Sequence, residues 1–201
     1  MDAVEALTTR ASAVKLGEPA PSDHLLATAL RAGARAPDHG LLRPWKFLLI
    51  RGAARYRLGD VFAEALKRRK PDVSEAVLER EEQKPLRAPL IIVVVAKVQP
   101  KHPKIPEIEQ VISAGTATQN IMLAFYAQGF GCMWRTGKLA YDPNVKEVLG
   151  LEPHDHIVAF LYVGTALAVT PERTRPDHHQ FIEVWNEGPA FAVSRNAVPG
   201  L

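Results

Sequence analysis

The stretch Leu90-Ile-Ile-Val-Val-Val-Ala-Lys-Val98 decides the fold class. It is rich in β-branched residues, and apolar and polar side chains do not alternate along it. This pattern is typical of a strand that is covered on both faces, in the middle of a sheet between helical layers. No apolar run in the chain is longer than its apolar part, Leu90 to Ala96, yet this is much shorter than the roughly 20 residues that a membrane-spanning helix needs. We therefore predict a buried central strand and no membrane association.

The segments on either side of this strand predict helices and further strands. Helices are expected at 2–10, 22–35, 53–70, 73–83, 107–128 and 142–150, from capping residues and apolar positions at helical spacing. Strands are expected at 45–50, 156–164 and 181–185, with a short one after the helix at 107–128. This order lacks the regular alternation of a doubly wound fold, and no Gly-x-Gly-x-x-Gly or Walker-type loop is present. We expect one α+β layered domain over 1–201, with a core at about 3–185 and a tail at 186–201.

The overall composition excludes several classes of protein. The 201 residues are 47% hydrophobic and 23% charged, which suits a globular domain with a sizeable core. The formal net charge is only +3, and the basic run Lys67-Arg-Arg-Lys70 ends a predicted helix without any nucleic-acid-binding motif. Asp2, Glu5 and Arg10 interrupt any apolar run that could form a secretion signal. We expect a cytoplasmic protein that binds neither nucleic acid nor membranes.

Cysteine and histidine usage favours no metal site. Cys132 is the only cysteine, so neither an internal disulfide nor a cysteine-based zinc cluster can form. His154-Asp-His156 and Asp177-His-His179 lack the i, i+4 spacing of a helical zinc pair. We therefore predict that the protein binds no metal.

Three motifs far apart in the chain carry groups suited to an anionic, planar ligand. Arg10-Ala-Ser12 places a guanidinium and a hydroxyl at a helix end, where both can bind one phosphate. Arg35-Ala-Pro-Asp-His39 precedes Arg43-Pro-Trp45 in a loop that leads into a strand. Gly129-Phe-Gly131 and Trp134-Arg-Thr-Gly137 offer close backbone approach and a stacking surface. Taken singly, each motif also fits an ordinary surface ion pair, connector or core anchor.

Two further segments bear on how the chain packs. The middle of the helix at 107–128, Ser113-Ala-Gly-Thr-Ala-Thr118, consists of small residues. Gly115 costs about 1 kcal/mol of helix propensity relative to alanine, so close approach of another backbone or a flat ligand is expected to offset it. The basic, proline-rich loop at 100–106 can be neither helix nor interior strand, and it can act either as a lid over a site or as a stiff connector.

Taken together and in order, these motifs resemble the nitroreductase family. The order is Arg-x-Ser near residue 10, Arg-Ala-Pro-x-His, and x-Pro-Trp before a strand. Gly-Phe-Gly and Trp-Arg-Thr-Gly follow the long helix, and Phe160-Leu-Tyr-Val-Gly-Thr165 comes last. The matching segments extend from about Ala3 to Trp185. The chain is most similar to the compact bacterial NAD(P)H nitroreductases of the YdjA type.

The resemblance implies a fold, a cofactor and an assembly. The fold would have a central, mainly antiparallel sheet flanked by helices, with a C-terminal strand at 181–185 exchanged between the subunits of a homodimer. Two FMN molecules would lie at the subunit interface, where the small-residue helix makes a close contact. The enzyme would use NAD(P)H to reduce nitroaromatic, quinone or related small acceptors by a ping-pong mechanism at the flavin.

The resemblance also implies which residues bind the cofactor: Arg10, Ala11, Ser12, Arg35, His39, Trp134, Arg135 and Thr136. The first three would hold the FMN phosphate through the Arg10 and Ser12 side chains. Arg35 would contact the cofactor from the same chain, and His39 from the other chain. Trp134 and the two residues after it would line the flavin. No catalytic residue is implied, because the flavin supplies the chemistry, and His39 is the one titratable group to test as a proton donor.

Two departures from the family pattern leave alternatives open. Ala11 stands where relatives often carry Arg or His, which could weaken phosphate binding. Arg43 precedes Pro44-Trp45 where many relatives have Gln, which could change substrate preference. A flavin-binding dimer with little turnover, and a specialised flavin-dependent oxidation on the same fold, are therefore the alternatives. The tail cations Arg173 and Arg175 are candidates to add charge at the phosphate.

Overall fold

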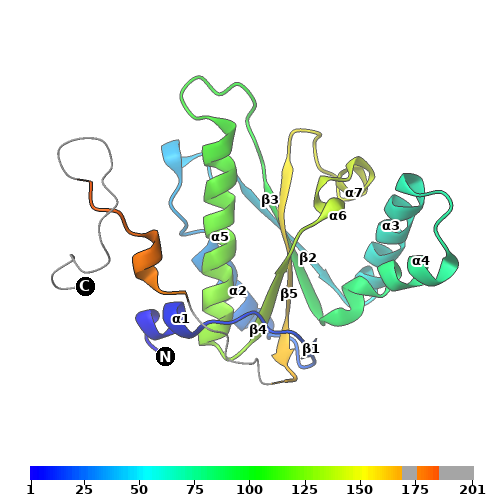
Figure 1. The fold of residues 1–201 in the computed structure, drawn as a ribbon, viewed down its shortest axis with the longest axis horizontal. Coiled ribbons are helices and arrows are strands. Elements are labelled where there is room, and N and C mark those ends of the chain that lie inside the picture. Colours follow the sequence, from blue (N-terminus) through cyan, green and yellow to red (C-terminus); the bar gives the residue numbers. More distant parts are fainter. Residues whose placement is uncertain (169–175, 186–201) are drawn as a thin grey trace. The chain divides into compact units, whose positions relative to one another are not determined.

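The predicted central strand is present as β3 (Leu90–Ala96), and all its residues are buried in the computed structural model, which describes residues 1–168 and 176–185. It pairs antiparallel with β2 (Trp45–Arg51) and with β5 (His156–Ala166). β5 also pairs antiparallel with β4 (Gly131–Arg135) and with the very short β1 (Leu16–Gly17). The prediction of a mainly antiparallel sheet is confirmed (Figure 1).

Helices cover both faces of this sheet (Figure 1). One face packs against α2 (Asp23–Gly33) and α5 (Glu107–Ala127), and the other packs against α3 (Ala54–Arg69). The remaining helices are α1 (Ala3–Thr9), α4 (Glu75–Glu82), α6 (Lys138–Tyr141) and α7 (Pro143–Val148), with 3₁₀ turns at His39–Leu41, Lys84–Arg87 and His178–Phe181. The layered α+β architecture is therefore as expected.

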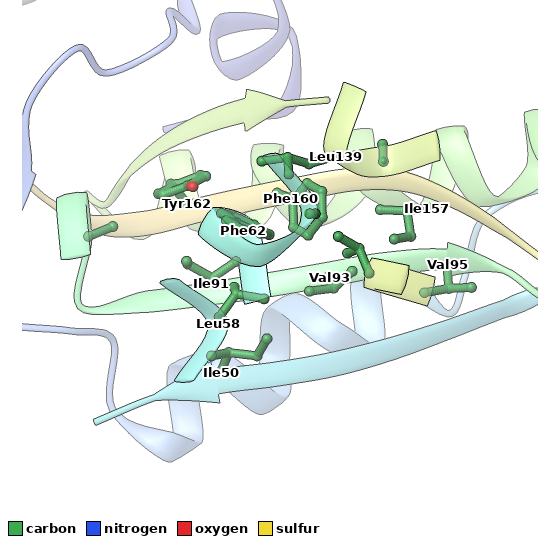
Figure 2. Packing of buried hydrophobic residues seen from close by; sticks show 14 of the residues in the cluster. Ile50, Leu58, Phe62, Ile91, Val93, Val95, Leu139, Ile157, Phe160 and Tyr162 are labelled. Carbon is green, nitrogen blue, oxygen red and sulfur yellow. The ribbon is translucent and has the colours of Figure 1, made fainter. Parts of the chain in front are cut away.

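The lack of polar alternation in β3 follows from its two packed faces. Ile91, Val93 and Val95 belong to the cluster on the α3 side, which Figure 2 shows at close range. In that cluster the rings of Phe62 and Phe160 meet edge to face, with centroids 5.2 Å apart. The intervening β3 residues belong to the cluster on the α5 side: Leu90, Ile92 and Val94. Both sets lie in apolar layers, so a polar residue at any of these positions would be buried.

Capping residues begin the helices where the sequence predicted. The Asp2 carboxylate accepts from the first backbone N–H groups of α1, and the Ser22 hydroxyl does the same at α2. Asp142 caps α7, which begins with Pro143, by accepting from Asn144 N at 3.0 Å. The second oxygen of Asp142 accepts from Arg69 Nη1 at 2.7 Å, so this buried carboxylate also ties α7 to the end of α3.

The longest helix, α5, buries one side against the sheet and exposes apolar residues on another. Ile121 and Phe125 lie in the core, whereas Ile108 and Ile112 are 63% and 58% exposed. In the described part of the chain, no helix combines the length and the apolar character needed to cross a bilayer.

The strand predicted at 181–185 is not a strand in the single chain. The segment belongs to a unit, Pro171–Leu201, that is separate from the unit Met1–Thr170, and in it Phe181 ends a 3₁₀ turn. Ile182 has extended backbone angles, but none of the described strands pairs with it. A strand needs hydrogen bonds to a neighbour, and the expected neighbour was the partner subunit, so the exchanged strand stays a prediction.

Candidate functional site

The motif Arg10–Ser12 lies directly after α1 and beside β4. Arg10 ends the helix, and Ala13 N donates to Cys132 O at 2.9 Å, which joins the segment to the strand. The Tyr126 hydroxyl donates to Thr9 Oγ1 at 3.1 Å. This corner of the molecule therefore lies at the C-terminal end of α5, which is the lower end in Figure 1.

A cavity of about 670 Å³ opens at this corner. From the two predicted motifs, its wall takes Ala11, Gly129, Phe130 and Gly131, whereas Arg10 and Ser12 are not among the lining residues. A Cβ at Gly131 would lie 2.7 Å from the Cβ of Ala13, so only glycine allows the segment after α1 to pack on β4. The volume lies within the range of small-molecule pockets.

The positive charge of Arg10 acts on the neighbouring Cys132 thiol in this corner. Burial raises the pKa of the Cys132 thiol to about 12, and the nearby guanidinium of Arg10 opposes that rise. The thiol is therefore protonated at neutral pH and is not a nucleophile. Arg10 supplies the positive charge that a phosphate at this position would need.

Trp134, Arg135 and Thr136 follow at the end of β4. Trp134 is half-buried against the α5-side core, and its indole Nε1 donates to Val158 O at 3.0 Å. Its N–H is therefore already used within the chain, which leaves the ring itself as its means of contacting a ligand. Arg135 and Thr136 are exposed.

Arg35 lies at the C-terminal end of α2, next to a second cavity of about 510 Å³. Leu7 of α1 and Asn120 and Leu123 of α5 line the same cavity. Arg35 is therefore on the same half of α5 as the Arg10 corner.

His39 lies at the other end of α5. Its Nδ1 is 2.5 Å from Oε2 of Glu109, in the first turn of the helix. From Glu109 to Tyr126, which contacts Thr9, the helix advances 17 residues, or about 25 Å at the usual rise. Arg10 and His39 of one chain are thus too far apart to contact the same end of a small ligand.

The loop at 100–106 is tied down next to His39. Gln110 is 1% exposed, and its side chain accepts from Gln99 N and donates to the carbonyls of Gln99 and Ile105. His102 Nδ1 accepts from Ile105 N at 3.0 Å. These bonds favour the stiff connector over the lid.

Sequence reasoning missed Glu109 and Tyr126. Both belong to a helix whose predicted role rested on its small middle residues, and an exposed acid in a first helical turn is a common feature without a local signature. Arg173 and Arg175 lie outside the described residues.

Within residues 1–168 and 176–185, one group of possible metal-ligand atoms occurs where no metal was expected. Ligand atoms of Asp177, His178 and His179 lie within 4.8 Å of one another on adjacent, solvent-accessible residues. Exposed groups of this kind are common without an ion. The absence of a metal therefore stays a prediction.

Comparison with known proteins gives a consistent result. The model of the nitroreductase family matches residues 8–165. The chain is 43% identical over 183 residues to an Escherichia coli (strain K12) protein named "Putative NAD(P)H nitroreductase YdjA", covering 90% of this chain and 98% of that protein. A nitroreductase-like family protein from Bacillus cereus has a TM-score of 0.80 at 24% identity, over 94% of this chain and 97% of its own. A nitroreductase with bound FMN from Bacteroides fragilis has a TM-score of 0.67 at 19% identity, and the match covers 88% of this chain and 95% of that chain.

The two solved structures, at 24% and 19% identity, are too distant in sequence to show more than a shared fold. The family model and the Escherichia coli relative each span most of the chain. This chain belongs to the nitroreductase family.

Proposed function

We propose that this protein is an FMN-dependent oxidoreductase that uses NAD(P)H to reduce small acceptors such as nitroaromatics or quinones, and that it works as a homodimer. The main observation in support is that two predicted cofactor-binding groups of one chain, Arg10 and His39, lie at opposite ends of α5, about 25 Å apart. Two chains packed with their α5 helices antiparallel would bring Arg10 of one chain towards His39 of the other. Each cofactor site would then need both subunits.

The phosphate end of the proposed site is the corner at Arg10. The guanidinium of Arg10 and the hydroxyl of Ser12 would hold the FMN phosphate through charge-assisted hydrogen bonds. The fit is supported by the adjacent cavity of about 670 Å³, which Ala11 and Gly131 line, because small residues leave room beside the charge. Ala11 offers no charge of its own, so Arg10 carries most of the attraction.

The remaining contacts would come from three directions. Arg35 would reach the cofactor from the same chain, and His39 from the partner. Trp134, Arg135 and Thr136 would line the flavin ring, with Trp134 fixed by its bond to Val158 O. A cation such as Arg135 near the ring would stabilise the negative charge that reduction adds.

The proposed dimer contact is the exposed face of α5. Ile108, Ile112 and Gly115 stand at i, i+4 and i+7 and so share one face of the helix. A Cβ added to Gly115 would meet nothing within 4 Å in this chain, so packing within the chain does not explain the glycine. A second α5 helix, from a partner subunit, crossing at that point would explain the glycine. Phe181 and Trp185, both exposed, would then supply apolar side chains to a strand completed by the partner.

When bound, FMN would take electrons from NAD(P)H and pass them to the acceptor in two separate half-reactions, a ping-pong cycle. The chain's own residues would bind, orient and partly shield it. No described residue is assigned a covalent role, and the buried Cys132 is unsuited to one.

A visible spectrum tests the proposal. The purified protein, with and without added FMN, is examined before and after anaerobic addition of NADH or NADPH. We expect a bound-flavin band that bleaches with one of the nucleotides. A band that persists would indicate a flavin-binding protein without this reductase activity, and the absence of flavin binding would refute the proposal.

A further inference from the structure

We propose that Glu109 is a positioning residue that fixes the tautomer and direction of His39, so that His39 offers a hydrogen-bond acceptor to the cofactor. This inference rests on the proposed function and extends it to a residue in the first turn of α5. It assigns a role to a contact between side chains 70 positions apart in the sequence.

The contact determines which ring nitrogen carries the proton. Nδ1 of His39 lies 2.5 Å from Oε2 of Glu109, and an ionised carboxylate can only accept. Nδ1 must therefore be the protonated nitrogen of the neutral ring. Nε2 is left with its lone pair as an acceptor for an N–H or O–H group of a ligand.

Glu109 sits on a rigid base. The next residue, Gln110, is 1% exposed and bonds to the backbone of Gln99 and Ile105. The first turn of α5 is therefore locked to the connector that precedes it. A carboxylate on such a base can hold an imidazole in one orientation.

The loop that carries His39 is held as firmly as the first turn of α5. Oδ2 of Asp38 accepts from Arg43 N at 2.6 Å and so closes the loop. A Cβ on Gly40 would lie 2.4 Å from Cδ1 of Ile105, so the loop sits directly on the connector. Leu41 and Arg43 have positive φ angles of 56° and 49°, in the left-handed region that residues with a side chain rarely adopt. Such strain persists only where the surroundings enforce it, and it is concentrated at ligand-binding sites.

The pair contributes little to fold stability, which points to a role in binding. The side chains of His39 and Glu109 are 59% and 43% exposed, and ion pairs that exposed are weak. Variants of Glu109 are therefore expected to fold, and an effect on cofactor affinity can be measured directly.

The first experiment reads the tautomer in the cofactor-free protein. Long-range ¹H–¹⁵N NMR spectra of the neutral His39 ring are compared for wild type, Glu109→Ala and Glu109→Gln. We expect Nδ1–H in wild type, population of Nε2–H in Glu109→Ala, and Nδ1–H again in Glu109→Gln, whose amide oxygen still accepts. The same tautomer in wild type and Glu109→Ala would overturn the proposal.

The second experiment measures FMN affinity by flavin fluorescence. Glu109→Ala should weaken binding about three- to tenfold, the scale of one hydrogen bond, and Glu109→Gln should restore most of it. Glu107→Ala removes an exposed acid from the same helical turn and is the matched control, expected to be neutral. In a His39→Ala background, Glu109→Ala should have no further effect, because Glu109 acts through that ring.

The outcomes separate the two proposals. If wild type binds FMN but Glu109→Ala behaves like Glu107→Ala, the role of Glu109 is refuted and the proposed function stands. If wild type does not bind FMN, the proposed function fails, and the role of Glu109 in cofactor binding fails with it.

Discussion

At the residue scale, the strongest prediction concerns Arg10. It adjoins Ala11, which lines the cavity at this corner and adds no second charge. Arg10→Ala should weaken FMN binding by about 1.5–3 kcal/mol, the scale of hydrogen bonds to a charged group. Titration of FMN fluorescence measures the change directly.

The control for Arg10 is an arginine remote from the cavity. Arg31 is exposed on α2 and donates to Thr28 in its own helix, so Arg31→Ala should leave FMN affinity unchanged. Thermal unfolding of the cofactor-free variants checks that both fold. Equal FMN affinity in Arg10→Ala and wild type would rule out the phosphate assignment.

The buried thiol of Cys132 and the buried phenol of Tyr162 are expected to make the protein less stable at alkaline pH. Burial raises the pKa of Cys132 from 9.0 to about 12, and that of Tyr162 from 10.0 to about 12. Well below pH 9 both groups are protonated in the folded and unfolded chains, so their contribution to the free energy of unfolding does not change with pH. Between about pH 9 and 12 the unfolded chain releases these protons while the folded chain keeps them, so stability must fall as pH rises.

Urea unfolding at a series of pH values from 8 upward tests this expectation. The alkaline slope should be shallower in Cys132→Ala and in Tyr162→Phe, whatever each substitution costs at pH 8. A variant slope identical to that of wild type would show that the missing group does not drive the loss.

The residue scale is also where sequence reasoning was weakest. Arg10 and the glycines at 129 and 131 could be singled out because their residue types have few uses at a helix end or strand start. Glu109 could not, because its role depends on His39, which the fold brings next to it across 70 positions. Pairings of this kind depend on tertiary structure and have no periodicity to detect.

At the element scale, Asp142 holds two elements with one carboxylate. It caps α7 and accepts from Arg69 of α3, and its side chain is 6% exposed. Asp142→Ala should destabilise the protein by about 2–4 kcal/mol, since it removes a cap and leaves a partly buried guanidinium without its partner. Asp2→Ala removes only the cap of the exposed helix α1 and should cost about 1 kcal/mol or less. Chemical denaturation of both variants tests the contrast, and equal losses would contradict it.

The exposed face of α5 predicts the effect of a charge on assembly. Ile112→Glu should convert the proposed dimer to monomer and abolish FMN binding, because a carboxylate at the centre of an apolar interface has no partner. Val148→Glu is a close control, since Val148 of α7 is also 58% exposed but lies on another part of the chain. Light scattering after gel filtration gives the mass of each. A dimeric Ile112→Glu protein would place the interface elsewhere.

Elements with strong local signals could be predicted, and those that depend on neighbours could not. The caps at Asp2, Ser22 and Asp142 and the unbroken apolar run of β3 gave nearly correct boundaries. β1 has two residues, too few for any periodicity, and exists because β5 extends past β3 to pair with it. The segment 181–185 has clear alternation, but a strand exchanged between subunits needs the partner chain to pair with, so this part stays a prediction.

At the scale of the whole molecule, the arrangement argues for shared sites. Arg10 and Arg35 lie towards one end of α5, and His39 lies at the other. A twofold axis across α5 would convert this separation within a chain into proximity between chains, twice in each dimer. Each site would then take its phosphate-binding group from one subunit and its imidazole from the other.

Subunit mixing tests that arrangement without a crystal. Arg10→Ala and His39→Ala homodimers should each bind FMN weakly, because every site lacks one group. Unfolding and refolding an equal mixture should produce heterodimers in which one site carries both substitutions and the other carries neither. Random pairing would restore about one quarter of all sites to wild-type affinity, since half the dimers are mixed and each has one intact site. Refolding each variant alone is the control and should restore none. If the mixture recovers no tight sites while wild type refolds and binds normally, Arg10 and His39 do not act on one cofactor across the subunit boundary.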